Sequence, residues 1–285
     1  MQESAFEGVG GLKIFTRSWQ PAGKPRGVVV IVHGFNAHSG HYLWVAEQFI
    51  AKGLAVYALD LRGRGNSEGE RFYIEKFDDY VNDVATFVNI VKSKEAGLPV
   101  FMLGHSAGGV TACVYTLDHQ SEIDGLICED FAFQIPAPDF ALAVLKGLSY
   151  VAPHFHALKL KNEDFSRDQN VVDSMNNDPL IEGESQPLET LAELVRADER
   201  LKEEIPQITL PVLILHGAAD KVARPSGSQF FYEAAGSADK TLKLYDGSFH
   251  NPLSDLDKEV VMADIQDWID ERISATNETA AVSGI

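Results

Sequence analysis

One serine of the 285-residue chain lies in a setting that suits nucleophilic catalysis. Ser106 is the middle residue of Gly104-His105-Ser106-Ala107-Gly108, which follows an apolar run at 100–103 and precedes a helical pattern at 107–119. A serine at such a strand-to-helix turn presents its hydroxyl group, and glycines two residues away on either side permit the close backbone packing that the turn requires. The amides that begin the helix can stabilise a developing oxyanion. The segment predicts a nucleophile elbow.

A serine nucleophile needs a general base, and the base needs a carboxylate that orients it. Asp220 follows the apolar run 212–215, and His250 follows the next predicted strand, so both lie where strands end, as the serine does. Serine, acid, histidine is a known chain order for such triads. We therefore predict a triad of Ser106, Asp220 and His250. The rival acids are Glu129 and Asp130, which end another strand and for which a capping or salt-bridge role is the alternative.

The second donor to an oxyanion is expected from the loop after an early strand. His33-Gly34-Phe35-Asn36 occupies that loop, after the apolar run 28–32. We predict that the backbone N–H groups of Phe35 and Ala107 face one substrate oxygen, and that His33 braces the loop rather than ionising. Loss of one such donor typically raises the barrier by roughly 3–4 kcal/mol.

Further segments carry a resemblance to a known family. They are His33-Gly34 with 38–42, the run 60–69 in the pattern D-x-R-G-x-G-x-S-x-G, Ser166-Arg167-Asp168 with Asp178-Pro179-Leu180, and 211–220. With the elbow and His250, the chain from residue 10 to 273 resembles the α/β-hydrolases of the monoacylglycerol lipase and lysophospholipase group, which includes relatives of the S33 serine aminopeptidases. The resemblance implies hydrolysis of monoacylglycerols or similar carboxylic esters without a metal or organic cofactor. Ala107 stands where that group usually has methionine, and we expect this to alter the width of the acyl pocket.

The elements that must position these residues alternate along the chain. Short apolar runs, which predict strands, lie at 28–32, 54–59, 100–103, 125–128 and 212–215, and a more polar one lies at 242–245. Helical patterns separate or follow them at 42–52, 78–92, 107–119 and 256–273. Strands that are apolar on both faces are typical of a parallel sheet covered by helices. Residues 12–19 alternate and predict an earlier antiparallel strand. We expect the α/β-hydrolase fold, with a mostly parallel central sheet flanked by helices.

A long segment without a good strand, 133–206, interrupts this alternation. It predicts a helical cap inserted before the last two core strands, between core parts 1–132 and 207–274, and a disordered tail at 275–285. An apolar helix is expected at 140–151, where Phe140, Val144 and Leu148 are the candidate substrate-binding residues. The alternative for this helix is packing of one stripe on the core. Residues 161–205 hold 13 acidic and five basic residues, so the cap is acidic.

Composition excludes several classes of protein. The net charge of −18 argues against nucleic-acid binding, which needs clustered Lys and Arg. Cys113 and Cys128 have apolar neighbours and predict buried core thiols rather than a disulfide framework. The N-terminus lacks the pattern of a signal peptide and no apolar run is long enough to span a membrane, so we expect a cytoplasmic location. The pairs His38/His41 and His154/His156 lack a supporting set of ligands, and no metal is expected.

We therefore expect a serine hydrolase that cleaves carboxylic esters through an acyl-enzyme, with an activity similar to that of monoacylglycerol lipases. A broad-specificity carboxylesterase or thioesterase is the first alternative. A serine aminopeptidase, which would need an amine site such as Glu163, Asp164 or Asp168, is another, as is a non-catalytic binding protein with this fold. The expected partner is a small ester or lipid, with transient contact of the cap with micelles or membranes. The oligomeric state is left open.

Overall fold

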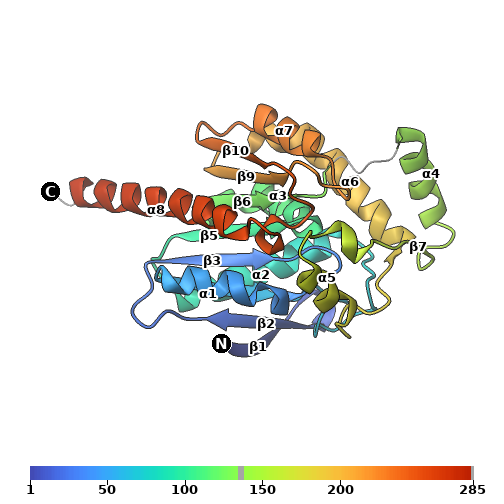
Figure 1. Cartoon of the computed structure of the whole chain (residues 1–285), viewed down its shortest axis with the longest axis horizontal. Coiled ribbons are helices and arrows are strands. Elements are labelled where there is room, and N and C mark those ends of the chain that lie inside the picture. The colour runs from blue at the N-terminus through green and yellow to red at the C-terminus, as the bar shows by residue number, and fades with distance from the viewer. Residues whose placement is uncertain (134–137, 284–285) are drawn as a thin grey trace.

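The computed structural model describes residues 1–133 and 138–283 and is built around one eight-stranded sheet (Figure 1). The strand order is β1-β2-β4-β3-β5-β6-β9-β10, in which β1 and β2 are antiparallel to their neighbours and all other pairs are parallel. The strands are β1 (Gln2–Glu7), β2 (Lys13–Trp19), β3 (Gly27–Val32), β4 (Leu54–Leu59), β5 (Val100–His105), β6 (Gly125–Glu129), β9 (Val212–Gly217) and β10 (Lys240–Tyr245). The predicted mostly parallel sheet is confirmed. Strand β1 was not predicted, because an edge strand with mostly exposed side chains carries no core pattern.

Helices cover both faces of this sheet. The helices of the described chain are α1 (Leu43–Ala51), α2 (Phe77–Lys94), α3 (Ala107–His119), α4 (Asp139–Ser149), α5 (Gln169–Asn176), α6 (Leu188–Glu204), α7 (Pro225–Ala234) and α8 (Lys258–Ser283), of which α4 and α5 lie in the segment between β6 and β9 rather than on the sheet. Short 3-10 helices occupy Val9–Gly11, Ser39–Tyr42, Gln120–Glu122, Asn162–Asp164, Ile205–Gln207 and Pro252–Ser254. In the part of the chain that the structure describes, no helix combines the length and the apolar character that crossing a membrane requires.

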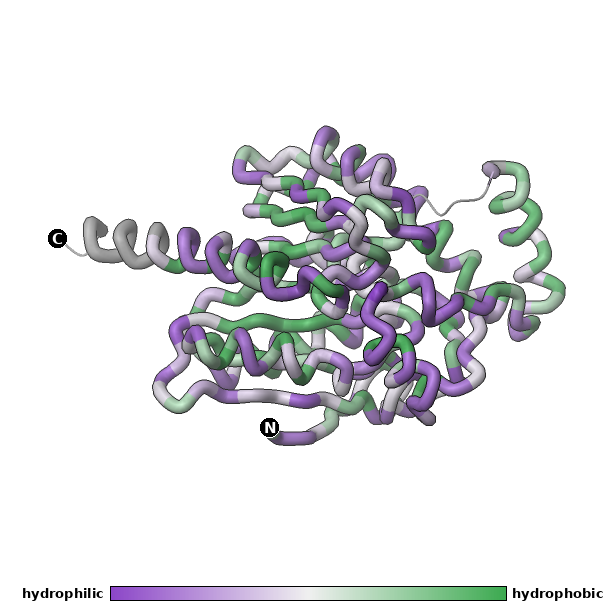
Figure 2. The backbone as a smooth tube through the Cα atoms, viewed as in Figure 1, coloured by the Kyte–Doolittle hydropathy of each residue, from purple (hydrophilic) through white to green (hydrophobic). Residues whose placement is uncertain are grey.

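The central strands are buried on both faces, as their continuous apolar runs predicted. In β3, Val28, Val30 and Val32 belong to the core shared with α2, α3, α6 and α7. Val29 and Ile31, which point the other way, belong to the core shared with α1 and α8. Figure 2 shows long hydrophobic stretches along these strands. Because every side chain of such a strand is buried, the strand is held rigidly and its carboxyl end is a stable platform for functional loops.

The segment between β6 and β9 contains α4, α5 and α6 and a two-stranded antiparallel sheet of β7 (His156–Leu158) and β8 (Gln186–Pro187). The sequence showed no good strand at 133–206, because strands of three and two residues are too short to show a period. The predicted apolar helix is present as α4. Helix α6 packs on α2 and α3 through Leu194 and Leu201, as part of the main core. The cap boundaries 133–206 stay a prediction, and 134–137 lie outside the described residues.

Helix α8 runs from Lys258 to Ser283 and extends beyond the body of the molecule in Figure 1. The disordered tail expected at 275–285 stays a prediction. Alanine and glutamate in this segment favour a helix, and no glycine or proline interrupts it before Gly284. Residues 284–285 lie outside the described range. Cys113 and Cys128 are buried free thiols with their sulfur atoms 3.4 Å apart, as predicted.

Candidate active site

Ser106 lies at the turn between β5 and α3, in a backbone conformation that few non-glycine residues adopt. Its φ is +55° and its ψ is −123°. The glycines around it are required by packing. A Cβ on Gly104 would lie 2.6 Å from the carbonyl oxygen of Gly108, and one on Gly108 would lie 2.2 Å from that of Val32. The chain therefore forms the strained strand–turn–helix arrangement that the G-x-S-x-G pattern predicted.

The three residues of the predicted triad are in contact. Ser106 Oγ lies 2.8 Å from His250 Nε2, and His250 Nδ1 lies 2.7 Å from Asp220 Oδ2. The loops after β5, β9 and β10 bring them together, since parallel strands end at one edge of the sheet. The other oxygen of Asp220 accepts N–H groups from Val222 and Ala223 at 2.7 and 3.1 Å. This pattern fits a His250 that donates from Nδ1 and accepts the serine proton at Nε2.

The electrostatics of the three residues suit this arrangement. The side chains of Asp220 and His250 are inaccessible to solvent, and Ser106 is only 2% exposed. Burial by itself would raise the pKa of Asp220, but the neighbouring His250 and His216 hold that pKa well below its usual range. Asp220 is therefore an anion at every physiological pH and can stabilise a positive charge on His250.

The loop after β3 contains the predicted oxyanion donor and is held in place from several sides. The backbone N–H groups of Phe35 and Ala107 have no hydrogen-bond acceptor among the described residues. His33 accepts the N–H of Leu61 at Nε2, 2.9 Å away, and its Nδ1 lies 2.7 Å from the carbonyl oxygen of Gly34. Burial lowers the pKa of His33 to about 3, so this histidine is neutral and braces the loop, as expected.

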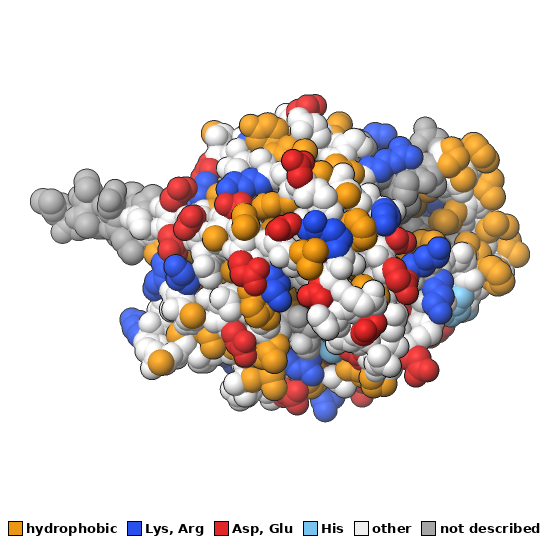
Figure 3. All heavy atoms as spheres, viewed as in Figure 1, with side chains coloured by type: hydrophobic (Ala, Val, Ile, Leu, Met, Phe, Trp, Pro, Cys, Tyr) orange, Lys and Arg blue, Asp and Glu red, His pale blue; other side chains and the backbone are white. Residues whose placement is uncertain are grey.

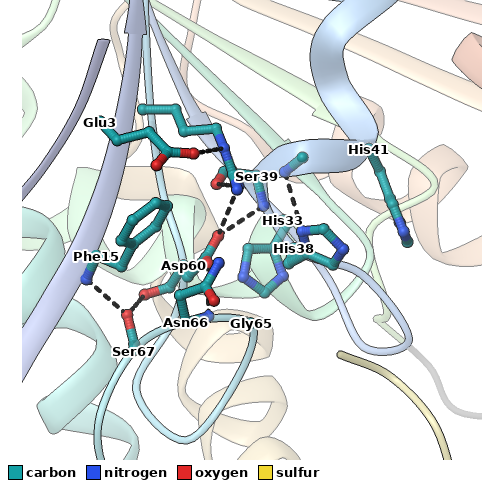
Figure 4. A network of polar contacts seen from close by, with 12 residues as sticks. Glu3, Phe15, His33, His38, Ser39, His41, Asp60, Gly65, Asn66 and Ser67 are labelled. Atoms are coloured by element: carbon teal, nitrogen blue, oxygen red, sulfur yellow. Dashed lines mark hydrogen bonds and ion pairs between the residues drawn. The ribbon is translucent and has the colours of Figure 1, made fainter. Parts of the chain in front are cut away.

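The predicted motif at 60–69 has a structural task beside this loop (Figure 4). Asp60 accepts the N–H of Ser39 at 2.7 Å and that of Asn66 at 2.8 Å, one on each carboxylate oxygen. Gly65 has φ +51°, and a Cβ there would lie 2.2 Å from Asp60. Ser67 Oγ donates to the Asp60 carbonyl oxygen at 2.6 Å and accepts the N–H of Phe15 at 2.8 Å. The motif ties β2 and the loop after β4 to the loop after β3.

A buried ion pair that the sequence analysis missed connects the cap to this loop. The Arg64 guanidinium is inaccessible to solvent, is paired with Glu184, and stacks 4.1 Å from the centre of the Phe35 ring. Glu184 Oε1 also accepts the N–H of Asn36 at 2.9 Å, and Gln186 accepts from Arg64 at 2.7 Å. Arg64 and Glu184 are 120 residues apart, so no local pattern could have paired them.

A second contact between cap and core joins His38 and His41 to Asp178. Both Nε2 atoms lie near one Asp178 oxygen, at 2.8 and 2.9 Å. These three residues have the composition of a metal site. However, His38 Nδ1 accepts the N–H of Gly40, so its Nε2 carries the proton and donates to Asp178. The hydrogen bonding therefore fits a latch between two parts of the chain better than metal ligands.

The rival carboxyl groups, Glu129 and Asp130, are buried beside the triad. Glu129 accepts the N–H of Leu253 at 2.8 Å, and burial raises the pKa of Glu129 to about 8. Asp130 accepts the N–H of Gly217 at 2.9 Å. Burial and then the neighbouring Asp220 raise the pKa of Asp130 well above its usual range. The surroundings of Glu129 and Asp130 therefore favour the protonated form of both, unlike those of Asp220.

Two cavities adjoin the site. One, of 370 Å³, is lined among others by Asn36, His105 and Asn251, which are sequence neighbours of Phe35, Ser106 and His250. The other, of 460 Å³, is lined mainly by apolar side chains of the cap, α6 and the loop after β9, among them Leu142, Leu145, Leu158, Leu191, Val195 and Val222. The second cavity reaches the loop that carries Asp220.

The candidate substrate-binding residues of α4 lie on the face opposite this cavity. Phe140, Val144 and Leu148 are 73%, 56% and 50% exposed, whereas Leu142 and Leu145 line the cavity. Figure 3 shows the resulting exposed apolar surface at the end of the molecule where Figure 1 places α4. These three residues therefore do not line this cavity, and their role in substrate binding stays a prediction; both faces of the helix are apolar.

Comparison with known proteins agrees with this geometry. The family model described as serine aminopeptidase, S33, matches residues 23–257. The chain belongs to the S33 serine aminopeptidase family of α/β-hydrolases. A monoacylglycerol lipase of Mycolicibacterium smegmatis is 33% identical over 271 residues, which are 94% of this chain and 96% of the relative. The predicted family is thereby confirmed.

Solved structures of relatives extend the likeness to the whole fold. The monoacylglycerol lipase of Paleococcus ferrophilus superposes with a TM-score of 0.81 at 27% identity, covering 92% of this chain and 98% of that one. A thermostable carboxyl esterase of Bacillus coagulans, solved in complex with glycerol, has a TM-score of 0.82 at 25% identity, with 95% and 98% covered. This family member is thus a hydrolase related to monoacylglycerol lipases and esterases.

Proposed function

We propose that this protein is a serine hydrolase that cleaves carboxylic esters, with monoacylglycerols as the preferred class of substrate. The observation that carries the proposal is the continuous contact from Ser106 through His250 to Asp220, at 2.8 and 2.7 Å. The strained backbone of Ser106 supports it, because such strain persists where function requires it.

The proposed reaction proceeds in two halves. Ser106 Oγ attacks the ester carbonyl carbon while His250 takes the serine proton, and Asp220 stabilises the imidazolium that forms. The N–H groups of Phe35 and Ala107 hold the oxyanion of the tetrahedral intermediate. His250 then protonates the leaving alcohol, which departs and leaves an acyl-enzyme. Water, deprotonated by the same His250, hydrolyses the acyl-enzyme and releases the acid.

The two cavities give the substrate its orientation in this proposal. The apolar 460 Å³ cavity under α4 takes the acyl chain, since its leucine and valine side chains remove methylene groups from water. The 370 Å³ cavity takes the alcohol, because its lining includes Asn170, Ser174 and Asn251, which can hydrogen-bond hydroxyl groups. The exposed stripe of Phe140, Val144 and Leu148 contacts the micelle or membrane from which the lipid is drawn.

Broad carboxylesterase or thioesterase activity is the alternative within the same mechanism. An aminopeptidase is less well supported, because two of the three acids that could hold a substrate amine have other partners. Asp168 caps α5 by accepting the N–H of Asn170, and Asp164 lies 3.9 Å from Lys221 Nζ. Glu163 is the third acid of this group.

A substrate panel tests the proposal. Purified protein is offered monoacylglycerols of increasing chain length, p-nitrophenyl esters, an acyl thioester and an aminoacyl amide, beside the Ser106→Ala variant. We expect the highest kcat/KM for a monoacylglycerol and a loss on the order of 10⁶-fold in Ser106→Ala. Preference for the amide, or turnover that survives Ser106→Ala, would refute the proposal.

A further inference from the structure

Two carboxyl groups, not one, lie behind the proposed catalytic histidine. Asp220 Oδ2 contacts His250 Nδ1 at 2.7 Å and lies 3.1 Å from His216 Nε2. Asp130 Oδ1 lies 3.5 Å from the same nitrogen of His216. One side-chain oxygen or nitrogen each of Asp130, Asp220 and His250 lies within 4.8 Å of the other two. Asp130 is thus a second carboxyl group within 4.8 Å of a His250 ring nitrogen.

Asp130 is held in this place by an unusual backbone. It follows β6 with φ +42°, a conformation that is uncommon for aspartate, and its side chain is inaccessible to solvent. One oxygen accepts the N–H of Gly217 at 2.9 Å. The other accepts no hydrogen bond from an N–H donor in the described part of the chain. A protonated Asp130 shares a side-chain hydrogen bond with Asp220, which ties the two carboxyl groups together.

The charges around Asp130 set its protonation state. Besides Asp220 and His216, the groups that face it are Glu129 from β6 and Tyr245 from β10. Burial first, then the negative charge of Asp220, raise the pKa of Asp130. Burial and Asp220 therefore both favour the protonated form of Asp130, while Asp220 is charged. Removal of the Asp220 carboxylate removes the second of these causes, so Asp130 ionises more readily beside His250.

We propose that Asp130 is a reserve positioning acid of the site, which orients and compensates His250 when Asp220 cannot. The inference rests on the proposed function in one respect, namely that His250 assists attack by Ser106. It concerns the acid that supports His250 and not the substrate, so it can be tested with a probe that does not depend on substrate preference.

The test measures the rate at which a fluorophosphonate labels Ser106. In this reaction the Oγ–P bond forms, the P–F bond breaks, fluoride leaves and the serine proton passes to His250. Four variants are compared with the wild-type protein: Asp220→Ala, Asp130→Asn, the double variant, and Glu129→Gln combined with Asp220→Ala as the matched control. Asparagine keeps the acceptor for Gly217, and glutamine keeps the acceptor for Leu253.

A triad that loses its only acid typically slows on the order of 10⁴-fold. We expect Asp220→Ala to lose only about 10²-fold and Asp130→Asn about threefold, while the double variant loses about 10⁴-fold. The Glu129→Gln control should remain near Asp220→Ala. A 10⁴-fold loss in Asp220→Ala that Asp130→Asn does not deepen would overturn the proposal, as would residual labelling that is the same in the double variant.

The pH profile separates positioning from a structural effect. In Asp220→Ala, fast labelling should require ionised Asp130, so the labelling rate should rise with pH over a range where the wild-type rate is already constant. The double variant should lack this rise. Melting temperatures show whether each variant is folded, and Asp220→Asn replaces Asp220→Ala if the latter is not. Labelling of a wild-type protein that hydrolyses no ester would refute the proposed function and leave this inference standing. A wild-type protein that does not label at all would refute both.

Discussion

The pairing of Arg64 with Glu184 predicts a specific defect when the cap loses its buried charge. In Glu184→Gln the amide oxygen can still accept the N–H of Asn36, but the Arg64 guanidinium is left buried without its counter-ion. Removing one partner of a buried ion pair typically costs about 3–5 kcal/mol. Tyr80 and Gln186 still bond Arg64, at 3.1 and 2.7 Å, so we expect the lower end, about 3 kcal/mol.

The same substitution should disturb catalysis, because Arg64 stacks on Phe35, whose N–H is the proposed oxyanion donor. Loss of one such donor typically lowers kcat by about 10²–10³-fold, and we expect a decrease near the smaller figure. Calorimetric or denaturant unfolding gives the stability, and hydrolysis of a soluble short-chain ester gives kcat. Glu182→Gln, two residues away and exposed, is the matched control. Exposed ion pairs typically contribute up to about 1 kcal/mol to stability. If the unfolding free energies of Glu184→Gln and Glu182→Gln differ by less than about that amount, the reasoning is refuted.

Three further outcomes follow from the structure. Gly108→Ala should destabilise the protein by several kcal/mol in thermal unfolding, because the added Cβ would lie 2.2 Å from a carbonyl oxygen. Gly147→Ala is the control: its Cβ would meet no atom within 4 Å, so this change should be neutral or stabilising by about 0.5–1 kcal/mol. The pKa of Glu129 is raised to about 8 in the folded protein, so folding favours the protonated carboxyl, and this contribution to stability is lost as pH rises from about 5 through 8. In denaturant titrations, the unfolding free energy of the wild type relative to Glu129→Gln should therefore fall over that pH range. A difference that does not depend on pH would contradict the prediction. Phe140→Ser with Val144→Ser should reduce hydrolysis of vesicle-bound monoacylglycerol several-fold and leave a soluble ester unaffected; equal effects on both substrates would place these side chains in the acyl pocket instead.

The sequence predicted best those residues whose place in the fold follows from the end of a single strand. The apolar runs placed Ser106, Asp220 and His250 after strands, and the rule that parallel strands end at one edge was enough to predict their proximity. It was also enough to place the loop of Phe35 beside them. No comparable rule relates Glu184 to Arg64 or Asp178 to His38, because their contacts depend on how the cap folds back over the core.

The cap shows a second limit. Helix α4 is apolar around most of its circumference, so the sequence could predict the helix but not which stripe faces the cavity. Strands β7 and β8 are too short to carry a period, and β1 buries too little to show one. Function was predictable to the level of an α/β-hydrolase related to lipases and esterases, because its motifs need few residues in a fixed order. The shape of the proposed acyl pocket depends on the cap and was not predictable.

The most direct test of the account is the mass of the protein during turnover. A slowly hydrolysed ester is mixed with the wild-type protein, the reaction is quenched in acid within the first turnover, and the intact protein and its peptides are weighed. We expect an acyl group on the peptide that contains Ser106, and no such group in the Ser106→Ala variant. The acyl group should leave the peptide at the rate at which the acid is released. Acid release without an adduct at Ser106, or the same adduct in Ser106→Ala, would contradict it.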